Sequence, residues 1–342
     1  MAATESRQPS TVAVVIPTYN RRDLVVQAVQ SVLGQSHRDL SCLVIDNGST
    51  DGTAEALAAI KDPRLKVLSE GSPLGGPAAR NVGIAAAKGA PWVAFLDSDD
   101  VWAPTKLERQ LASLALAPEA AWSATACVDV GEDMTVRHGL RLFGGSSAAR
   151  GVILFSPSEL REQLKADCTV PAGNTTVLAS RALLEQAGGF DTQLSTCDDW
   201  DLWLRFAALS VLVYVDVPLA AYRIWLGQSS SNERAFMRDA ATVRARYFPE
   251  AGPLPRQYVA RWEREAARRN VAAGRRLEAT SSYVRAAWVG RAPGQLAYAV
   301  AAATVPQVTE RRLRQLERTQ RLPEGWEAEV EPWLAPYRTP SS

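Results

Sequence analysis

An acidic cluster follows an apolar run in the first third of the chain. The run 92–96 is typical of a buried strand, and Asp97, Ser98, Asp99 and Asp100 come directly after it. Open α/β sheets bind their ligands at the carboxyl ends of such strands. Neighbouring carboxylates repel one another unless a cation neutralises them, and Mg²⁺ and Mn²⁺ prefer carboxylate and phosphate oxygens. By itself the cluster indicates a metal–diphosphate site or, equally well, a solvated acidic turn before the next helix.

A second acidic pair, Asp198 and Asp199, precedes a segment whose apolar residues recur at helical spacing. The pair is therefore expected in the first turn of a helix. Four apolar residues would anchor this helix in the core: Trp200, Trp203, Leu204 and Ala207. A carboxylate at a helix start can cap the helix and complement its dipole, or it can act as a general base. Taken alone, the pattern favours capping. The positive end of the helix is expected to keep the pKa of Asp199 low.

Strands and helices that alternate in the first half of the chain must position these acids. Short apolar runs predict buried strands at 12–16, 43–45 and 92–96, and an alternating pattern predicts a half-buried strand at 122–128. Helical periodicity separates these runs, which indicates a parallel sheet with helices on its faces. The predicted fold class is therefore α/β.

Helix boundaries are predicted from capping residues. The first helix begins at a capping pair formed by Asn20 and Asp23, and it ends at Gly34. The remaining boundary signals are Ser49 or Thr50 at the start of the second helix, Pro77 and Gly89 at the two ends of the third, and Pro104 before the fourth.

Two stretches lack strand patterning. Residues 131–150 have few periodic apolar positions, so we expect a loop there, with a flap over the site as one option. From about residue 232 the chain is rich in Ala, Arg and Glu, with apolar residues at helical spacings and no strand-like run. We therefore expect a catalytic domain at residues 1–231 and a helical C-terminal extension at residues 232–342.

Composition and charge exclude several classes of protein. The 38 Lys and Arg residues nearly balance the 37 Asp and Glu residues, so the chain has no overall basic field that would bind nucleic acid by charge alone. Its four cysteines lie far apart, without the spacing of a zinc site or the density of a disulfide scaffold. No apolar run reaches the roughly 20 residues of a membrane helix, and the first residues do not resemble a signal peptide. These features predict a cytoplasmic protein, with peripheral contact at the inner face of the membrane left open.

Three segments occur in a fixed order: VAVVIPTYNRRD, LVIDNGSTDGT and GGPAARNVGIAAAKGAPWVAFLDSDD. Together they resemble family 2 glycosyltransferases of the GT-A fold, and the resemblance covers about residues 11–226. It implies a Rossmann-like GT-A catalytic domain that transfers a sugar, with inversion, from a nucleotide-diphosphate donor. In such a domain Mn²⁺ or Mg²⁺ would bind the diphosphate.

The resemblance assigns a nucleotide-sugar site to residues of these segments. Asp46 would accept the imide proton of the base, which slightly favours UDP or dTDP over GDP, because a mismatched base would leave a buried acceptor unpaired. Asp97 would face the ribose, and Asp99 would ligate the metal. The other residues of the site would be Pro17, Thr18 and Tyr19 beside the base, Arg80 in the nucleotide pocket, and Ser98.

The segment GNTTVLASRALLEQAGGFDTQLSTCDDWDLWLRFA resembles the acceptor-side block of the family, which ends in an acidic pair before a helix. The resemblance makes Asp199 the catalytic base and Asp198 its support. Two positions depart from the family pattern. Asn47 stands where a second aspartate is common, and Trp225 stands where a histidine can complete the metal site. Without that histidine, the metal would be held by Asp99, diphosphate oxygens and water.

The sequence leaves the acceptor open and disfavours several rival functions. The acceptor could be a glycan, a lipid-linked molecule or a natural product, and the helical extension could bind a second copy or another protein. A scaffold protein with an inactive nucleotide-sugar fold is disfavoured by the intact acids Asp97, Asp99 and Asp199. A sugar nucleotidyltransferase or a dinucleotide-dependent oxidoreductase is disfavoured because the first strand runs into PTYNRR without a glycine-rich loop.

Overall fold

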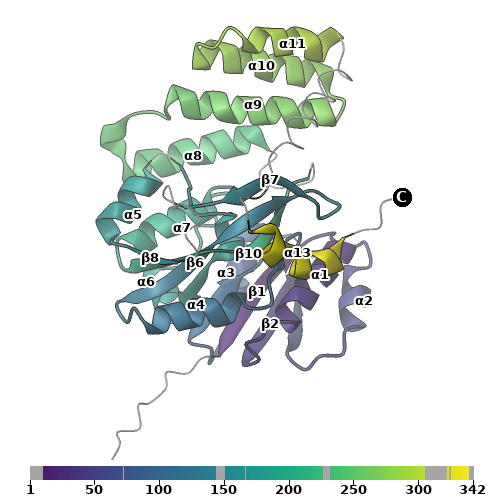
Figure 1. The fold of residues 1–342 in the computed structure, drawn as a ribbon, viewed down its shortest axis with the longest axis vertical. Helices are drawn as coiled ribbons and strands as arrows, with labels where there is room; N and C mark the ends of the chain where they lie inside the picture. Colours follow the sequence, from purple (N-terminus) through teal and green to yellow (C-terminus); the bar gives the residue numbers. More distant parts are fainter. Residues whose placement is uncertain are drawn as a thin grey trace, which may run out of the picture.

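The computed structural model describes residues 11–71, 73–143, 151–165, 167–225, 232–304, 322 and 325–338. Within these ranges the strands form one mixed sheet, which lies below the C-terminal helices α8 to α11 in Figure 1. Its strand order is β3-β2-β1-β4-β9-β6-β10-β5, with β7 paired to β6 and β8 paired to β10. The strands are β1 (Val12–Thr18), β2 (Leu40–Asp46), β3 (Leu65–Ser69), β4 (Trp92–Phe95), β5 (Val101–Trp102), β6 (Ala120–Val130), β7 (Val136–Arg141), β8 (Val152–Phe155), β9 (Leu178–Ser180) and β10 (Val211–Arg223). The helices that surround the sheet are α1 (Arg22–Leu33), α2 (Thr53–Ala58), α3 (Gly76–Ala86), α4 (Lys106–Ala115), α5 (Pro157–Leu164), the 3-10 helix η1 (Gly173–Thr176), α6 (Arg181–Ala187) and α7 (Asp198–Ala207). The C-terminal helices are α8 (Glu233–Tyr247), α9 (Arg256–Ala272), α10 (Arg276–Gly290), α11 (Gln295–Thr304) and α13 (Glu327–Leu334).

β1 is the centre of the N-terminal part of the sheet. It pairs in parallel with β2 and β4, and β2 pairs in parallel with β3. The parallel arrangement predicted for the first half of the chain is confirmed. Parallel strands end at the same edge of a sheet, so Thr18, its register partner Asp46 and the residues after Phe95 lie side by side.

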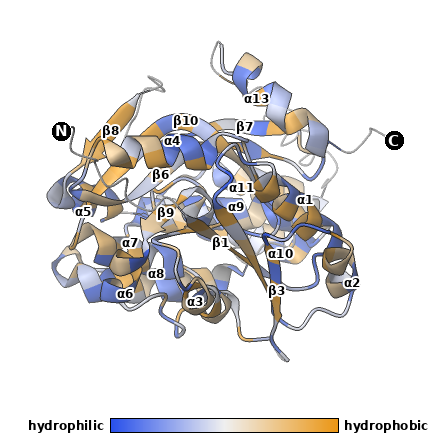
Figure 2. Ribbon diagram, turned by 90° about the horizontal axis from the view of Figure 1, so that it is seen from below, coloured by the Kyte–Doolittle hydropathy of each residue, from blue (hydrophilic) through white to orange (hydrophobic). Residues whose placement is uncertain are grey.

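Both faces of β1 are buried, which explains its uninterrupted apolar sequence. Val12, Val14 and Ile16 pack with residues of α1 and α4 on one face. Ala13 and Val15 pack on the other face with residues of α3, α6 and α7. β1 is coloured as hydrophobic in Figure 2, where α1 and α3 lie on either side of it.

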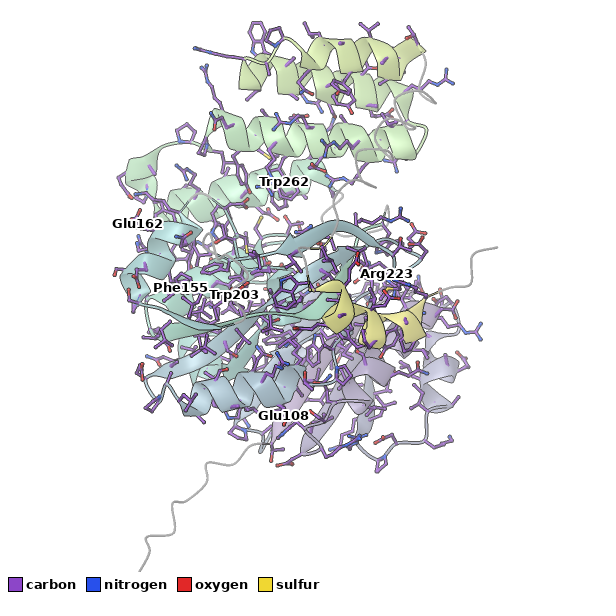
Figure 3. All side chains as sticks on the ribbon, viewed as in Figure 1. Glu108, Phe155, Glu162, Trp203, Arg223 and Trp262 are labelled. Atoms are coloured by element: carbon purple, nitrogen blue, oxygen red, sulfur yellow. The ribbon has the colours of Figure 1, made fainter. Side chains whose placement is uncertain are left out.

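Tryptophans anchor α7, the helix that carries the acidic pair. Trp200 and Trp203 are fully buried, and Trp203, which Figure 3 labels, stacks on Trp122 of β6 with ring centroids 5.4 Å apart. Trp200 Nε1 also donates a hydrogen bond to Leu164 O at 2.8 Å. Because α7 begins at Asp198, both carboxylates lie in its first turn. The prediction for this helix is confirmed.

Two predicted helix caps are wrong, because the polar side chains there join two loops instead. α1 begins after Arg21, and the Asn20 side chain accepts a hydrogen bond from Thr50 N rather than capping the helix. α2 begins after Gly52, where no side chain caps the helix. The Ser49 hydroxyl, expected at that cap, accepts a hydrogen bond from Asn20 N.

Other helix ends are closer to the prediction. Gly34 ends α1, and Pro77 lies in the first turn of α3. α3 ends at Ala86 rather than at Gly89, and Gly89 provides a positive φ of 87° in the turn before β4.

Two predictions for the middle of the chain are wrong. Within 131–150, expected as a loop, β7 pairs antiparallel with β6, because main-chain pairing compensates for its weak apolar pattern. Residues 144–150 of that stretch lie outside the described residues. The strand expected to be half-buried at 122–128 is part of β6, where core residues cover both faces and bury it throughout.

The predicted C-terminal helical region is confirmed for the residues that the structure describes. α8, α9, α10 and α11 stack in order away from the sheet (Figure 1), and no strand occurs in 232–304 or 325–338. α8 contributes Ala240 and Val243 to the core that contains residues of α7. α13 packs Val330 against residues of β5, β6 and β10. None of the helices in the described ranges is long and apolar enough to cross a membrane.

A glycine lets α3 lie directly on β1. A Cβ at Gly83 would overlap the methyl groups of Val15. We expect Gly83→Ala to lower the free energy of unfolding by about 1–3 kcal/mol, because overpacking outweighs the higher helix propensity of alanine. Urea unfolding measures the change.

Gly71→Ala is the control, since a Cβ at Gly71 meets no atom within 4 Å. Its free energy of unfolding should stay within about 0.5 kcal/mol of the wild-type value. Val15→Ala in the same chain should relieve most of the additional cost of Gly83→Ala. A Gly83→Ala protein as stable as wild type would contradict the close packing of α3 on β1.

Candidate active site

Hydrogen bonds tie together the two loops that follow β1 and β2. Asn20 N donates to Ser49 Oγ at 2.9 Å, and Thr50 N donates to Asn20 Oδ1 at 2.7 Å. Asn20 has a φ of 50°, a left-handed conformation that asparagine tolerates better than most residues. Between the loops, the Asp46 carboxylate is buried and accepts a hydrogen bond from Ser49 N at 3.0 Å. We call the region between these two loops, at the ends of β1 and β2, the corner. Tyr19 is 48% exposed, so its side chain lies on the solvent-exposed side of this corner.

Backbone contacts complete the corner. Pro17 and Thr18 end β1, and Thr18 is paired with Asp46 in the sheet register. Thr18 O accepts a hydrogen bond from Asn47 N at 2.9 Å. The Asn47 side chain, which stands where a second aspartate is common, accepts a hydrogen bond from Leu74 N at 2.6 Å and so holds the loop before α3.

Arg80 of α3 joins the two acidic segments. Its Nη2 donates to Asp97 Oδ1 at 2.7 Å, and its Nη1 donates to Asp198 Oδ2 at 2.9 Å. The guanidinium is buried and its carbon lies 5.5 Å from the centre of the Phe190 ring. Burial alone would lower the pKa of Arg80, but the two carboxylates outweigh burial and raise it. One forked cation therefore holds Asp97 and Asp198 together.

Asp99 already has two partners on one of its oxygens. Arg21 Nη1 lies 2.6 Å from Asp99 Oδ2, and Trp225 Nε1 donates to the same oxygen at 2.7 Å. The Arg21 guanidinium also lies 4.9 Å from the centre of the Trp225 ring. Trp225 is therefore a hydrogen-bond donor to Asp99 at the position where a histidine was expected. In the described part of the chain, no three His, Cys, Asp or Glu side chains are grouped as metal ligands.

Asp100 is held by the protein itself. Its buried side chain accepts hydrogen bonds from the Thr175 hydroxyl and from Arg223 N. Burial and the neighbouring carboxylates raise the pKa of Asp100 well above its usual range. Thr175 Oγ1 also accepts a hydrogen bond from Asp97 N at 3.3 Å. Thr175 therefore ties the acidic turn after β4 to η1.

Asp199 lies half-buried beside η1. Trp200 N donates to Asp199 Oδ1 at 2.7 Å, and Cys168 Sγ lies 3.7 Å from Oδ2. A Cβ at Gly173 would overlap this carboxylate, and Gly173 has a positive φ of 49°. Both the space and the backbone conformation therefore require glycine at this position.

The low pKa expected for Asp199 is wrong in direction. Burial raises the pKa of Asp199, and the hydrogen bond from Trp200 N opposes the shift only in part. Burial also raises the pKa of Asp198 to about 7, although Arg80 opposes this shift. Desolvation of two adjacent carboxylates outweighs the favourable helix N-terminus. The pair therefore holds a proton more tightly than isolated aspartates do.

α8 fixes the segment that leads into α7. Asp239 of α8 accepts hydrogen bonds from the backbone N and the hydroxyl of both Ser195 and Thr196, at 2.9 to 3.1 Å. Within α7, the buried Asp201 forms an ion pair with Arg246 of α8 at 2.6 Å. The first helix of the C-terminal region therefore positions the start of α7.

The site residues predicted from the sequence fall into two neighbouring groups. The acidic group consists of Arg80, Asp97, Ser98, Asp99, Asp198 and Asp199. The group at the ends of β1 and β2 consists of Pro17, Thr18, Tyr19 and Asp46. Arg21 joins the groups, because it follows the PTYN sequence and contacts Asp99.

Sequence reasoning missed four residues of this site: Arg21, Cys168, Gly173 and Thr175. Three of them carried a usable signal. Arg21 directly follows PTYN, and Gly173 and Thr175 belong to the GNTT that begins the acceptor-side block. Nothing in the sequence around Cys168 points to its contact with Asp199.

The chain is similar to curated proteins of one family. The family model described as Glycosyl transferase family 2 matches residues 13–162. The putative teichuronic acid biosynthesis glycosyltransferase TuaG of Bacillus subtilis (strain 168) is 31% identical over 226 residues, which are 65% of this chain and 82% of TuaG. Five further curated relatives match over 100 to 103 residues, and the matches cover only 14% to 40% of their length.

Solved structures share the fold of this chain. TarS residues 1–349 from S. aureus, in complex with UDP-GlcNAc, has a TM-score of 0.56 at 17% identity, with 90% of this chain and 92% of that chain covered. The mannosyltransferase PcManGT from Pyrobaculum calidifontis, in complex with GDP-Man and Mn²⁺, has a TM-score of 0.50 at 19% identity, with 92% and 87% covered. At these identities the likeness concerns the fold alone. It confirms the predicted α/β fold of the GT-A type.

The raised pKa of Asp198 predicts how stability depends on pH. A carboxyl group with a higher pKa in the folded protein than in the unfolded chain binds protons more tightly when folded. Its contribution to stability therefore falls as the pH rises from about 4 to about 7. Because asparagine does not titrate, we expect the free energy of unfolding of Asp198→Asn, relative to that of wild type, to rise over that range. Urea unfolding at about pH 4.5, 6 and 7.5 measures the difference.

Asp191→Asn is the control. Its ion pair with Arg246 helps to lower the pKa of Asp191, so Asp191 is ionised in both states at these pH values. The stability difference between this variant and wild type should stay constant over the range. A constant difference for Asp198→Asn as well would contradict the raised pKa.

Proposed function

The chain belongs to glycosyl transferase family 2, and we propose that it transfers a sugar, with inversion, from a nucleoside-diphosphate donor to an acceptor hydroxyl or amine. The contact of Arg80 with both Asp97 and Asp198 carries this proposal. This contact supports a site in which Asp97, on the donor side, lies next to α7, the helix that carries the proposed base. A single displacement requires that proximity.

We assign the nucleotide base to the corner formed by the ends of β1 and β2. The exposed Tyr19 side chain offers a surface for the base, and the buried Asp46 carboxylate offers an acceptor for its imide N–H. Arg80 lines the nucleotide pocket, and Asp97 faces the ribose. UDP or dTDP is proposed over GDP. The TarS complexes with UDP and UDP-GlcNAc support a uridine donor, whereas the PcManGT complex contains GDP-Man.

A divalent metal fits the chemistry of the acidic group. Mg²⁺ binds through one or two carboxylates together with substrate phosphates and water, and Asp99 would supply such a carboxylate. Arg21 and Trp225 contact one oxygen of Asp99, so Arg21 would have to share that carboxylate or give up its contact. A bound Mg²⁺ or Mn²⁺ would neutralise charge on the diphosphate. The Mn²⁺ complex of PcManGT supports divalent metal use in proteins of this fold.

Asp199 is the proposed general base. Its carboxylate takes the proton of the acceptor hydroxyl while the acceptor oxygen bonds to the anomeric carbon. The bond from that carbon to the diphosphate oxygen breaks, and its electrons leave with the nucleoside diphosphate. Arg80 and Arg21 stabilise the charge on this leaving group, and Asp198 supports the base helix through Arg80. The raised pKa of Asp199 makes it a stronger base than an isolated aspartate.

The acceptor is proposed by class. It is a glycan, a lipid-linked molecule or a natural product, and the description of TuaG in teichuronic acid biosynthesis supports a glycan.

The enzyme is proposed to be cytoplasmic, with peripheral contact at the inner face of the membrane. The division into a catalytic domain at 1–231 and an extension at 232–342 stays a prediction. α8 begins beside that boundary and holds the segment before α7, so we propose that it works with the catalytic domain while the outer helices bind partners.

Asp199→Asn tests the proposed base. Asparagine keeps the shape and can still accept the hydrogen bond from Trp200 N, but it cannot take a proton at neutral pH. We expect the fold and the UDP affinity to remain, and kcat for transfer to fall by roughly two to four orders of magnitude. Released nucleoside diphosphate, measured with donor and acceptor present, gives kcat.

Asp198→Asn is the comparison, because it removes a carboxylate from the same helical turn. It should weaken the contact with Arg80 and lower kcat less than Asp199→Asn does. A larger loss in Asp198→Asn would move the base to Asp198. If neither variant lowers kcat tenfold, the proposed base is wrong.

Asp99→Ala tests the proposed metal ligand. We expect the additional UDP affinity that Mn²⁺ provides to disappear, because the carboxylate proposed to hold the metal is gone. Calorimetric titration with UDP, with Mn²⁺ or with a chelator, measures it. Trp225→Phe is the control, since it removes a hydrogen-bond donor but keeps the carboxylate, and it should retain the Mn²⁺ effect. Asp99→Ala with the wild-type Mn²⁺ effect would locate the metal elsewhere.

A further inference from the structure

An exposed apolar stripe runs along α10, far from the acidic group. Leu277 is 84% exposed and Trp288 is 86% exposed, and Val284 between them is also exposed. Their spacing places all three on one face of the helix, opposite the buried Tyr283 and Ala286. Single exposed apolar residues are ordinary, but three large ones on the same face of a helix mark an interaction surface.

α11 also exposes apolar side chains at this end of the molecule. It packs on α10, and its ten residues Gln295–Thr304 include no charged side chain. Leu296 and Val300, one helical turn apart, are exposed, with Val300 at 62%. We define the distal apolar face as Leu277, Val284, Trp288, Leu296 and Val300. Figure 1 shows α10 and α11 at the end of the helical stack farthest from the sheet, and Figure 3 shows the stack continuing inward through Trp262 on α9.

Positive charge lies at both ends of the α10 part of the distal apolar face. Residues 256–304 contain nine arginines and three glutamates, a formal net charge of +6, whereas the whole chain has a net charge of +1. Arg275, Arg276 and Arg291 lie at the two ends of α10 and are exposed. These three make no ion pair with any residue in the described ranges. Their charge is therefore available to a partner.

The exposed apolar side chains and the unpaired arginines together distinguish between two possible partners, a second copy of the chain and an anionic bilayer. In an interface with a second copy, the like-charged arginines of the two chains would be brought together, which is unfavourable. An anionic bilayer instead accommodates both features. Apolar side chains enter the boundary between headgroups and acyl chains, where tryptophan is enriched, and arginines are attracted to the negative surface.

We propose that the distal apolar face docks on the surface of a bilayer that contains anionic lipids. Leu277 and Trp288 enter the headgroup boundary, and Arg275, Arg276 and Arg291 contact lipid phosphates. The attachment is peripheral and weakens as salt rises, because its electrostatic part is screened. The docking does not depend on which residue is the base or which acceptor is used.

Sedimentation with lipid vesicles tests this docking. The full chain is mixed with vesicles of phosphatidylcholine alone, or of phosphatidylcholine with about 30% phosphatidylglycerol, at low and at high salt. Wild type should sediment with the anionic vesicles and be released by salt. The double variant Leu277→Ser with Trp288→Ser should lower the vesicle partition coefficient about tenfold or more, because two large apolar side chains no longer insert. The triple variant of Arg275, Arg276 and Arg291 to Gln should lower it on anionic vesicles alone.

Leu116→Ser is the matched control. Leu116 is 84% exposed, as Leu277 is, but it lies at the end of α4 beside the sheet. This variant should sediment as wild type does. Equal sedimentation of wild type and the double variant, or no preference of wild type for anionic vesicles, would overturn the proposal. A dimer in sedimentation velocity that the double variant abolishes would assign the face to a second copy and overturn it too. UDP titration of the same proteins reports separately on the proposed function.

Discussion

A buried guanidinium is costly unless carboxylates surround it in good geometry. Arg80 meets that condition with two carboxylates from opposite halves of the sequence, Asp97 at 2.7 Å and Asp198 at 2.9 Å. Each partner in turn depends on its own element, because Asp97 follows the buried β4 and Asp198 begins the tryptophan-anchored α7. The close contact of Gly83 with Val15 sets the distance between α3 and β1, and this distance determines where the Arg80 guanidinium lies. Packing of three elements therefore converges on one cation.

The three acids after β4 are neutralised in two ways, by arginines and by a raised pKa. Asp97 pairs with Arg80, Asp99 pairs with Arg21, and Asp100 accepts hydrogen bonds while its pKa is raised. The folded chain therefore holds its acidic turn together with its own groups. A metal would act on the charge of the bound diphosphate rather than on the charge of the turn, which agrees with the preference of such ions for carboxylate and phosphate together.

Local patterns in the sequence were enough to predict the parallel strands, α7 and the helical C-terminal region. Strands buried on both faces appear as apolar runs, and packed helices appear as apolar residues at helical spacing. Arg21 and Thr175 lie in segments that the sequence marks, but their pairing with Asp99 and Asp100 was not predictable, because these contacts form only in the tertiary structure. The pKa of Asp199 was mistaken for the same reason: the helix dipole is visible in the sequence, whereas the burial that outweighs it is a property of the fold. β7 was missed because strand pairing, rather than an apolar pattern, stabilises it.

The central claim is that Arg80 makes the acidic turn and the base helix one electrostatic unit. A double-mutant cycle between Asp97→Asn and Asp198→Asn tests it most directly, with the free energy of unfolding measured by urea without ligand. Each single variant leaves the guanidinium one carboxylate, whereas the double variant leaves a buried cation without either. The loss in the double variant should therefore exceed the sum of the single losses by about 1 kcal/mol or more, and Arg80→Met should abolish this excess. Additivity within about 0.5 kcal/mol would contradict the claim.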